Sequence, residues 1–564
     1  MTYSPPVEEQ RFLLRHIVGI DELAGHNAFS EASEDVVDAI VEGAGAFAAG
    51  EFAPLNRIGD QVGAKWSAEG VTMPPGFREA YRAYVEAGWG TLAGPADYGG
   101  QGLPLSLATV VMEDLGSANM AFSLVMMLTP GAVEALKHHG SDELKRQWLP
   151  RLITGEWTGT MNLTEPQAGS DVGALKTRAE PAGNGSYRIS GQKIFITFGE
   201  HDLTDNIVHL VLARLPDAPA GTKGISLFLV PKILPEGSRN DVRCVSIEHK
   251  LGIHASPTCV MSYGDEGGAT GWLIGEENRG MAAMFTMMNN ARLNVGLQGV
   301  SIAERATQQA VAFACERVQG TRLGRPARIV EHPDVRRMLL RMKALTQAAR
   351  ALAYYTAGQT DRGALGDLDA QARADLLTPL VKAYGTDVGV EVTSLAVQVH
   401  GGMGYVEETG AAQHYRDARI SPIYEGTNGI QAADLVMRKL PMQGGEILRR
   451  LLGDVRRDAP DELTRLVQTC GDVAERLLTG GADDRLAASY PFLTMLAVAV
   501  CGWLMNRQAA ALEEAGLNPE FVAAKGAAVR FYLEQIVPEA IGLSAAATAP
   551  AELLYAISEE AFAA

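Results

Sequence analysis

The hydrophobic pattern of the chain changes type twice, and this limits the folds that it can adopt. From about residue 36 to 156 apolar residues recur at helical spacing, as in DVVDAIVEGAGAFAAGEF. From about 157 to 275 short β-rich runs such as YRISGQKIFIT and GISLFLVPKIL are separated by Gly, Pro, Asn and Asp. Helical spacing then returns and persists to about residue 445, and an Ala/Leu-rich helical stretch follows it. One β-rich block between helical segments predicts helices and strands in separate domains.

The chain has 564 residues, too many for one hydrophobic core, so we expect several domains. We predict an α+β multidomain fold with an N-terminal helical domain, a central β-barrel-like domain, a C-terminal four-helix bundle and an additional C-terminal helical domain. The expected parts are an N-terminal extension at 1–35, the helical domain at 36–156, the β-domain at 157–275, the bundle at 276–445 and the additional domain at 446–564.

Charge and cysteine content exclude some classes of function. The net charge of −18 argues against nucleic acid as a main partner, because phosphate binding needs a cationic surface. The five cysteines are odd in number and no pair has metal-ligand spacing, so we predict reduced thiols, no metal site and a cytoplasmic location. The start, MTYSPPVEEQRFLL, lacks the basic and apolar regions of a signal peptide.

One apolar stretch is long enough to span a membrane. Residues 486–505, LAASYPFLTMLAVAVCGWLM, contain no charged side chain over 20 positions. Pro491 interrupts this stretch, and Ser489 and Thr494 make it more polar. We therefore predict a helix buried within an all-helical domain, with peripheral membrane contact as the alternative.

The segment SPIYEGTNGIQ, residues 421–431, places a single carboxylate between apolar and small residues. Glu425 follows Ile423 and Tyr424 and precedes a Gly-Thr-Asn-Gly run. Such residues are typical of a turn, so the segment is predicted to be a loop rather than the interior of a helix. Glu425 is then either a catalytic base or a solvated loop acid, and composition alone favours the second.

Two further motifs lie in the β-rich block. LTEPQAGSD follows the run WTGTMN, and its hydroxyls and glycine would allow close approach to a planar polar ligand. A strand-to-turn loop capped by Ser and Asp would have the same composition. In GQKIFIT, Phe195 is expected to project from the face opposite its two isoleucine neighbours and from the same face as Thr197. Phe195 would either stack on an aromatic cofactor or fill the core.

The segment QVHGGMGY, residues 398–405, has three glycines in four positions. Its backbone N–H groups could approach phosphates or carbonyls closely, although a helix-ending turn has the same residues. It is not the dinucleotide GxGxxG motif, because no strand leads into it. Arg292 and Arg317 lie on long helical segments, where most arginines are solvated.

Together and in this order, the four motifs resemble those of the acyl-CoA dehydrogenase family. LTEPQAGSD resembles the family's TEPxAGSD, GQKIFIT its GxKxWIT, QVHGGMGY its QxxGGxG and PIYEGTNGIQ its IYEGTxxIQ. The resemblance covers about residues 40–440. The extra N-terminal segment, KLGIHASPTCV and the long C-terminal extension are similar to a subgroup that includes the 3-methylmercaptopropionyl-CoA dehydrogenases.

The resemblance implies the FAD-dependent conversion of a saturated acyl-CoA thioester to a trans-2-enoyl-CoA. Glu425 matches the base that takes the α-proton while hydride leaves the β-carbon for flavin N5. Some members carry the base on a helix, just before the arginine that corresponds to Arg292, and this chain has Ala291 there. The candidate substrates are 3-methylthiopropionyl-CoA and straight-chain fatty acyl-CoA, and an electron-transfer flavoprotein is the expected electron acceptor.

The resemblance also implies a set of contacts. The cofactor-binding residues are expected to be Leu163, Thr164, Gly169, Ser170, Phe195, Thr197, Arg317, Gln398, Gly401, Gly402 and Thr427. The substrate-binding residues are expected to be Ser170, Arg292, Tyr424 and Gly426. Phe195 stands where the family often has Trp, and Gly320 stands where its ERxxF motif has Phe. Arg317 and the Gly-rich turn match positions that reach the FAD of a neighbouring subunit, so a homo-oligomer, at least a dimer, is expected.

Two other functions remain alternatives. An acyl-CoA oxidase would use the same base and pass electrons to oxygen. A non-catalytic flavoprotein binding module, similar to alkylation-response proteins, would bind DNA through a basic C-terminal domain. Residues 445–564 contain 10 Lys and Arg against 17 Asp and Glu, a net charge of −7, which is the wrong sign for DNA.

Overall fold

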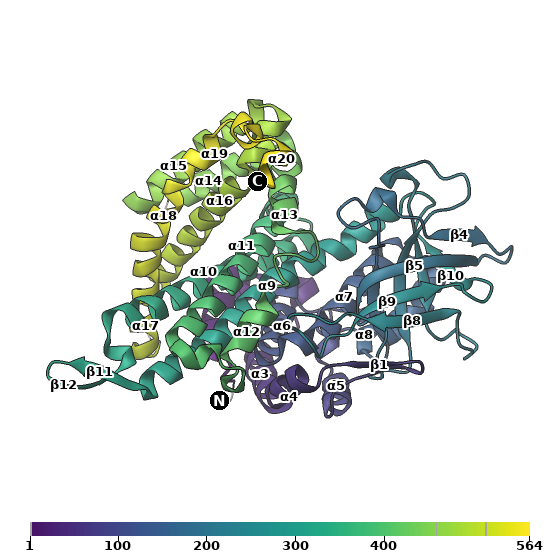
Figure 1. The fold of residues 1–564 in the computed structure, drawn as a ribbon, viewed down its shortest axis with the longest axis horizontal. Coiled ribbons are helices and arrows are strands. Elements are labelled where there is room, and N and C mark those ends of the chain that lie inside the picture. Colours follow the sequence, from purple (N-terminus) through teal and green to yellow (C-terminus); the bar gives the residue numbers. More distant parts are fainter. Residues whose placement is uncertain (1–2, 458, 514–515) are drawn as a thin grey trace. The chain divides into compact units, whose positions relative to one another are not determined.

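The computed structural model describes residues 3–457, 459–513 and 516–564 (Figure 1). The chain forms two compact units. One contains Glu42–Ala291, and the other contains Pro6–Val41 and Arg292–Ala564. Helices predominate and most strands fall in the first unit, so the predicted α+β multidomain class is confirmed. The domain boundaries expected from the sequence remain predictions.

The first unit combines helices with an eight-stranded sheet. Its helices include α4 (Ala53–Val62), α5 (Phe77–Glu86), α6 (Leu105–Ala118), α7 (Met120–His139) and α8 (Asp142–Thr154), and a hairpin joins β1 (Lys65–Ser67) to β2 (Gly70–Thr72). The sheet strands are β3 (Thr158–Asn162), β4 (Arg178–Pro181), β5 (Tyr187–Thr197), β6 (Ile207–Ala213), β7 (Ser226–Pro231), β8 (Val242–Ile247), β9 (Thr258–Tyr263) and β10 (Ala269–Ile274). They are ordered β3-β6-β7-β10-β5-β9-β8, and β4 pairs with β5.

Strand β10 joins the two halves of the sheet. Its residues 269–271 pair with β5 and its residues 272–274 pair with β7. Side chains from strands of both halves meet in one core, including Ile189, Val211 and Met261. Strands β6 and β7 are buried along their whole length, which explains why their sequences are almost continuously apolar. This arrangement is the central sheet of the predicted fold class.

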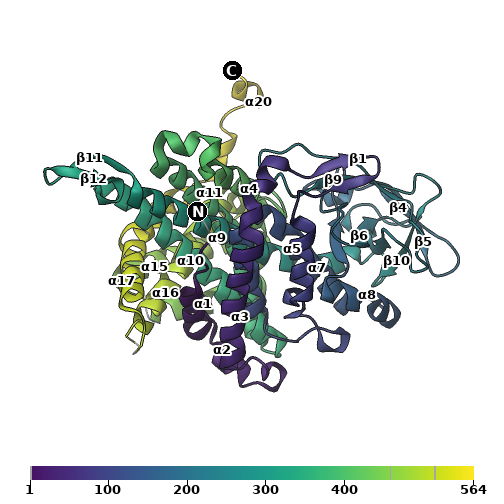
Figure 2. The same cartoon turned by 90° about the horizontal axis from the view of Figure 1, so that it is seen from below.

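The second unit is built on long helices. Helix α9 (Gly280–Glu316) leads into it, and α10 (Pro333–Ala364) and α11 (Leu368–His400) pack along each other (Figure 1). A hairpin of β11 (Val318–Arg322) and β12 (Arg325–Arg328) projects from these helices in both views (Figures 1 and 2). The prediction that helical structure persists from 276 to 445 is wrong at this hairpin. Gly320 and Gly324 adopt φ of +74° and +75° there, which an α-helix does not allow.

The C-terminal residues form further helices of the same unit. These are α14 (Glu446–Arg457), α15 (Asp461–Thr479), α16 (Ala482–Ala511), α17 (Pro519–Phe531), α18 (Val537–Gly542), α19 (Ser544–Thr548) and α20 (Glu559–Phe562). Helix α16 holds the uncharged stretch and packs against α10, α11 and α15. By length and composition α7 and α16 could each cross a membrane, but 83% of each apolar window is buried within the protein. The predicted buried helix is therefore confirmed.

The N-terminal segment packs against these C-terminal helices. Glu9 of α1 (Val7–Leu13) accepts a hydrogen bond from Lys525 of α17, and the Lys525 side chain is fully buried. The aromatic ring of Phe12 packs edge-on against that of Phe521, with 5.5 Å between the ring centroids. The extension predicted at 1–35 is thus tied to the end of the chain.

Candidate active site

Glu425 lies on a short loop that leads into helix α13 (Asn428–Asp434). The N–H of Asn428 donates to the carbonyl of Pro422 at 2.9 Å and closes this loop, residues 421–427, which we call the Glu425 loop. The Thr427 hydroxyl caps the helix by accepting a backbone N–H of its first turn at 3.2 Å. The predicted loop is present, but it ends at Thr427, and the Asn-Gly pair that follows begins the helix instead.

The backbone of the Glu425 loop is strained. Glu425 has a left-handed φ of +56°, which few non-glycine residues adopt, and Gly426 follows with +83°. The side chain of Gln431 reaches back and donates to the carbonyls of Glu425 and Gly426 at 3.3 and 3.4 Å. Within the described chain, no protein acceptor receives the N–H of Glu425 or Gly426. A strained turn with two open N–H donors is typical of a binding or catalytic site.

The substitution Gly426→Ala is expected to destabilise the protein by about 1–2 kcal/mol. An added Cβ would lie 2.9 Å from the amide nitrogen of Gln431, and alanine would have to keep the left-handed φ of +83°. Gly429→Ala is the matched control, because its Cβ would meet only the Thr427 hydroxyl at 3.7 Å. Thermal unfolding of both variants measures the difference. Equal midpoints would contradict the strain assigned to the loop.

Buried charges of both signs surround Glu425, which is itself partly buried. Arg292 of α9 is 6% exposed, and its Nη1 lies 3.4 Å from Oδ2 of Asp434. Burial raises the pKa of Glu425 above its ordinary value, while the charges of Arg292 and Lys382 oppose that rise. A carboxylate with a raised pKa is a stronger base than a solvated glutamate. The expectation that an arginine on such a helix is solvated is wrong for Arg292.

Lys382 is a residue of this site that the sequence analysis missed. It lies on α11, it is fully buried, and its Nζ donates to Oδ1 of Asn428 at 2.8 Å. Burial lowers the pKa of Lys382 to about 7, although the charges of Glu425 and Asp387 counteract this. The one signal in the sequence is a lone lysine inside the apolar run LTPLVKAYG. That lysine had to be either exposed or paired.

Tyr424 is fixed beside Glu425 by a residue of α9. Its hydroxyl donates to Oε1 of Gln298, and burial raises the pKa of this phenol, so it stays neutral. The Nε2 atom of Gln298 is buried and has no partner among the described residues. The structure therefore brings Arg292 of α9 next to the consecutive residues 424–427, and the roles predicted for these residues remain proposals.

In the other unit, Glu165 shapes the loop that follows β3. Its carboxylate accepts the backbone N–H groups of Lys176 and Thr177 at 2.6 and 3.0 Å and the Nζ of Lys193 at 2.8 Å. Lys193 also donates to the carbonyl of Leu163 at 3.0 Å. Burial alone would raise the pKa of Glu165, but the charge of Lys193 and these hydrogen bonds lower it to about 2. The carboxylate is therefore ionised at neutral pH. Burial lowers the pKa of Lys193 to about 8, against the charge of Glu165, so this lysine stays mainly protonated at pH 7 and loses its proton as the pH rises through 8.

The predicted flavin-contact residues of this unit lie on the loop after β3 and on β5, which the ion pair joins. The N–H of Ile194 donates to the carbonyl of Thr164 at 2.9 Å, which joins the loop to β5 next to Phe195. A Cβ at Gly169 would meet open space, and Ser170 is exposed. The hydroxyls of this loop were predicted from the sequence, whereas the Glu165 carboxylate that holds the loop was not.

Phe195 is 58% exposed and has a left-handed φ of +59°. Lys193 pairs with Met261 and Ile196 pairs with Cys259, so β5 carries one extra residue between them. This bulge interrupts the strict alternation that the sequence predicts for the strand, and bulges often re-aim a side chain next to a site. Phe195 is not a core aromatic, and its ring is open to a flat ligand.

A third group of predicted residues lies at the ends of α9 and α11. Helix α9 ends just before Arg317, and α11 ends at His400, where Gly401 has a φ of +60°. The rings of Phe313 and His400 stack at 4.5 Å and hold the two helix ends together. The Gly-rich motif is thus a helix-ending turn. All four predicted residues are exposed there: Arg317, Gln398, Gly401 and Gly402.

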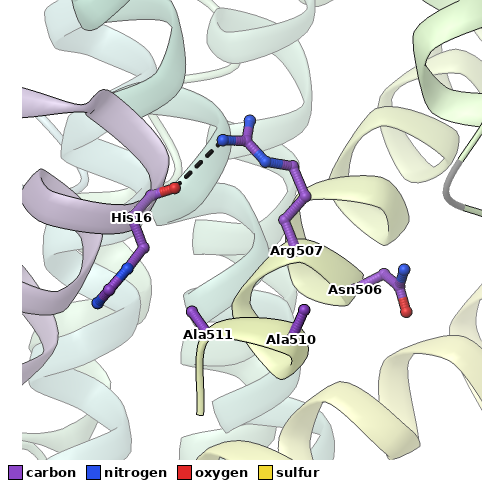
Figure 3. A pocket seen from close by; sticks show the side chains of 5 residues that line it. All are labelled: His16, Asn506, Arg507, Ala510 and Ala511. Carbon is purple, nitrogen blue, oxygen red and sulfur yellow. Dashed lines mark hydrogen bonds between the residues drawn. The ribbon is translucent and has the colours of Figure 1, made fainter. Parts of the chain in front are cut away.

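A separate hollow of about 460 Å³ opens beside α16 (Figure 3). It is lined by His16, Asn506, Arg507, Ala510 and Ala511. Arg507 donates to the carbonyl of His16 at 3.2 Å, and its guanidinium lies 5.2 Å from the ring of Trp503. This arginine is used in packing, and none of the predicted site residues lines the hollow. The hollow is therefore not part of the candidate active site.

Models of known protein families match successive parts of the chain. Family models match residues 35–156 (acyl-CoA dehydrogenase, N-terminal domain), 160–265 (middle domain), 278–440 (C-terminal domain) and 445–558 (acetyl-CoA dehydrogenase C-terminal like). The chain belongs to the acyl-CoA dehydrogenase family. The predicted family and subgroup are confirmed. The chain is an oxidoreductase that dehydrogenates an acyl-CoA thioester.

Individual relatives cover the C-terminal extension as well. The chain is 46% identical to 3-methylmercaptopropionyl-CoA dehydrogenase of Ruegeria pomeroyi, over 96% of this chain and 97% of that protein. It is 34% identical to a butyryl-CoA dehydrogenase of Syntrophomonas wolfei, over 99% of each chain. The solved structure of an acyl-CoA dehydrogenase from Bacillus anthracis in complex with FAD has a TM-score of 0.74 and 22% identity, and the match covers 94% of this chain and 91% of that chain. This last likeness shows the fold.

The cofactor of this acyl-CoA dehydrogenase is FAD, and the residues present fit it. Phe195 offers an exposed aromatic face beside the loop that Glu165 holds. A Cβ at Gly169, on that loop, would have nothing within 4 Å beyond its chain neighbours, so the loop backbone is open to close approach by a ligand. When bound, FAD supplies an acceptor for the hydride that leaves the β-carbon of the acyl group.

Proposed function

We propose that Glu425 is the base that removes the α-proton of a short acyl-CoA thioester. The observation that supports this is the left-handed Glu425 loop, which places a carboxylate of raised pKa next to two backbone N–H groups that lack a protein acceptor. Thr164, Ser170, Phe195 and Thr197 would contact the flavin, and Tyr424 would line the acyl pocket. These roles follow the family motifs at the matching positions.

The chemistry follows from two features of the Glu425 loop, its carboxylate and its open backbone N–H groups. A thioester α-proton is weakly acidic, so the base needs a pKa above that of a solvated glutamate, and burial shifts the pKa of Glu425 in this direction. As the proton moves to the carboxylate, negative charge develops on the thioester oxygen. The N–H groups of Glu425 and Gly426 are preorganised donors that would stabilise this charge. The expected product is a trans-2-enoyl-CoA.

The named relatives support a short acyl group. One carries the name 3-methylmercaptopropionyl-CoA dehydrogenase and another the name butyryl-CoA dehydrogenase, and both are matched over nearly their whole length. Both acyl groups have short, unbranched chains. One methylene in an apolar pocket changes specificity by about 10- to 200-fold. We therefore propose 3-methylthiopropionyl-CoA or a short straight-chain acyl-CoA as the substrate.

Anaerobic mixing of the flavoprotein with acyl-CoAs from C4 to C18, and with 3-methylthiopropionyl-CoA, tests this proposal. The flavin absorbance is expected to bleach fastest with 3-methylthiopropionyl-CoA and the shortest straight chains, and at least about tenfold more slowly with C16. Fastest bleaching with C16 would overturn the proposed substrate. An absence of bleaching with every thioester would overturn the proposed reaction.

Peroxide yield in air separates a dehydrogenase from an oxidase. We propose an electron-transfer flavoprotein as the acceptor, so little peroxide is expected during turnover. Stoichiometric peroxide would favour the oxidase alternative.

We also propose a cytoplasmic homo-oligomer, at least a dimer. In the family, the residues that match Arg317 and the Gly-rich turn contact the FAD of a neighbouring subunit, and in this chain both are exposed.

A further inference from the structure

The first residue of α13 is fixed by side chains of α11. Asn428 is 3% exposed, and its Oδ1 accepts the Nζ of Lys382 at 2.8 Å. Its Nδ2 donates to Oδ1 of Asp387 at 2.8 Å and to the carbonyl of Ala383 at 3.1 Å. Since Asn428 directly follows the Glu425 loop, these bonds determine where that loop ends.

The chain of hydrogen bonds continues into the C-terminal extension. The hydroxyl of Tyr490, on α16, donates to Oδ2 of Asp387 at 2.6 Å. Asp387 thus accepts from Asn428 with one oxygen and from Tyr490 with the other. Helix α16 also packs directly against α13 and α11. The residues after 445, whose role the sequence analysis left open, therefore reach within two hydrogen-bonded side chains of the loop.

We propose that Lys382, Asn428 and Asp387 are positioning residues that hold the Glu425 loop in its strained conformation. Tyr490 of the C-terminal extension fixes the far end of this chain. The inference rests on the proposed role of Glu425 as the base. The C-terminal extension thereby contributes to the reaction indirectly. It positions the base and does not contact the reacting atoms.

Lys382 acts on Glu425 through charge as well as position. Charged and titratable groups from several elements act on Glu425 and on the residues bonded to it. They are Arg292 of α9, Lys382 and Asp387 of α11, Asp434 and Arg438 around the end of α13, Tyr490 of α16, and Arg419 and Tyr424 of the segment that precedes α13. The positive charge of Lys382 favours the ionised form of Glu425. Its removal raises the pKa of Glu425 further.

Two substitutions of Lys382 separate charge from position. Lys382→Gln removes the charge and keeps an N–H donor for Asn428, whereas Lys382→Met removes both. In single-turnover bleaching by butyryl-CoA, the acid limb of the pH–rate profile is expected to move up by about one pH unit in both variants. The maximal rate is expected to fall further in the Met variant than in the Gln variant. Profiles that superimpose on the wild type would overturn the role of Lys382.

Tyr490→Phe tests the contribution of the C-terminal extension. The maximal bleaching rate is expected to fall by about ten- to a hundredfold, because small displacements of a base are costly, while the FAD content stays unchanged. Tyr532→Phe is the matched control. It removes a 2.8 Å hydroxyl–hydroxyl bond between the extension and Tyr384 of the same α11, outside the chain that reaches Asn428. Equal rates for the two variants would overturn the role of Tyr490.

A parallel Glu425→Gln variant distinguishes the two levels of the account. If it bleaches like the wild type, the proposed base is wrong. If it does not bleach while the Lys382 and Tyr490 variants behave like the wild type, this inference alone is wrong. Flavin absorbance and the thermal midpoint of each variant show whether a lost rate comes from lost folding or from a displaced loop.

Discussion

Replacement of Glu425 by Gln is expected to lower kcat by about 10²- to 10⁴-fold while the protein keeps its FAD. The amide has nearly the shape of the carboxylate but cannot accept the α-proton. Steady-state turnover with butyryl-CoA or 3-methylthiopropionyl-CoA, and the flavin spectrum of the resting protein, measure the two parts of this result. Glu408→Gln is the control, because Glu408 is exposed and its loss is expected to leave kcat unchanged.

The same substitution is expected to stabilise the protein slightly near pH 8. The pKa of Glu425 in the folded protein lies above its ordinary value, so the folded state holds the proton more tightly than the unfolded state. The ionised carboxylate therefore opposes folding, and stability rises as the pH falls through the raised pKa. A neutral glutamine removes this effect. A thermal midpoint at pH 8 well below that of the wild type would contradict the burial assigned to Glu425.

Lys193→Met is expected to destabilise the protein by about 3–5 kcal/mol and to weaken FAD retention. The Lys193 side chain is fully buried and its Glu165 partner is 3% exposed, so the substitution leaves an unpaired carboxylate in the interior. It also removes the donor to Leu163 that holds the loop after β3. Denaturant unfolding and the flavin content of the purified variant measure the two effects.

Two further variants test whether the ion pair is responsible. Lys176→Met changes an exposed side chain on a residue whose backbone N–H donates to the same Glu165 carboxylate, and it is expected to shift stability by less than about 0.5 kcal/mol. The double variant Lys193→Met with Glu165→Gln removes the unpaired charge, so part of the lost stability is expected to return. If the double variant is less stable than Lys193→Met alone by the full cost of a second lesion, the pair is not the cause.

The sequence was sufficient to predict the order of helical and β-rich segments and the loop that carries Glu425. Hydrophobic spacing separated helices from strands, and turn residues placed Glu425 on a loop. Four motifs in family order then identified the family. These features are local, because each depends on residues a few positions apart. The structure also groups Tyr424, Glu425 and Gly426 with Arg292, a grouping that came from the family motifs rather than from spacing.

What the sequence did not reveal depends on contacts between distant residues. The bond from Lys382 to Asn428 joins positions 46 apart, and that from Tyr490 to Asp387 joins positions 103 apart. Nothing in the spacing of these residues marks them as partners. The bulge at Phe195 and the hairpin that follows Arg317 were also missed, because both depend on single residues in left-handed conformations rather than on periodicity.

Anaerobic stopped-flow bleaching with butyryl-CoA, carrying either hydrogen or deuterium at C2, tests the assignment of Glu425 most directly. The wild type is expected to bleach more slowly with the deuterated thioester, since the C2–H bond breaks as the carboxylate takes the proton. The Glu425→Gln variant, with its FAD still bound, is expected to stay oxidised over many wild-type half-lives. Bleaching of that variant at the wild-type rate would show that another group removes the proton.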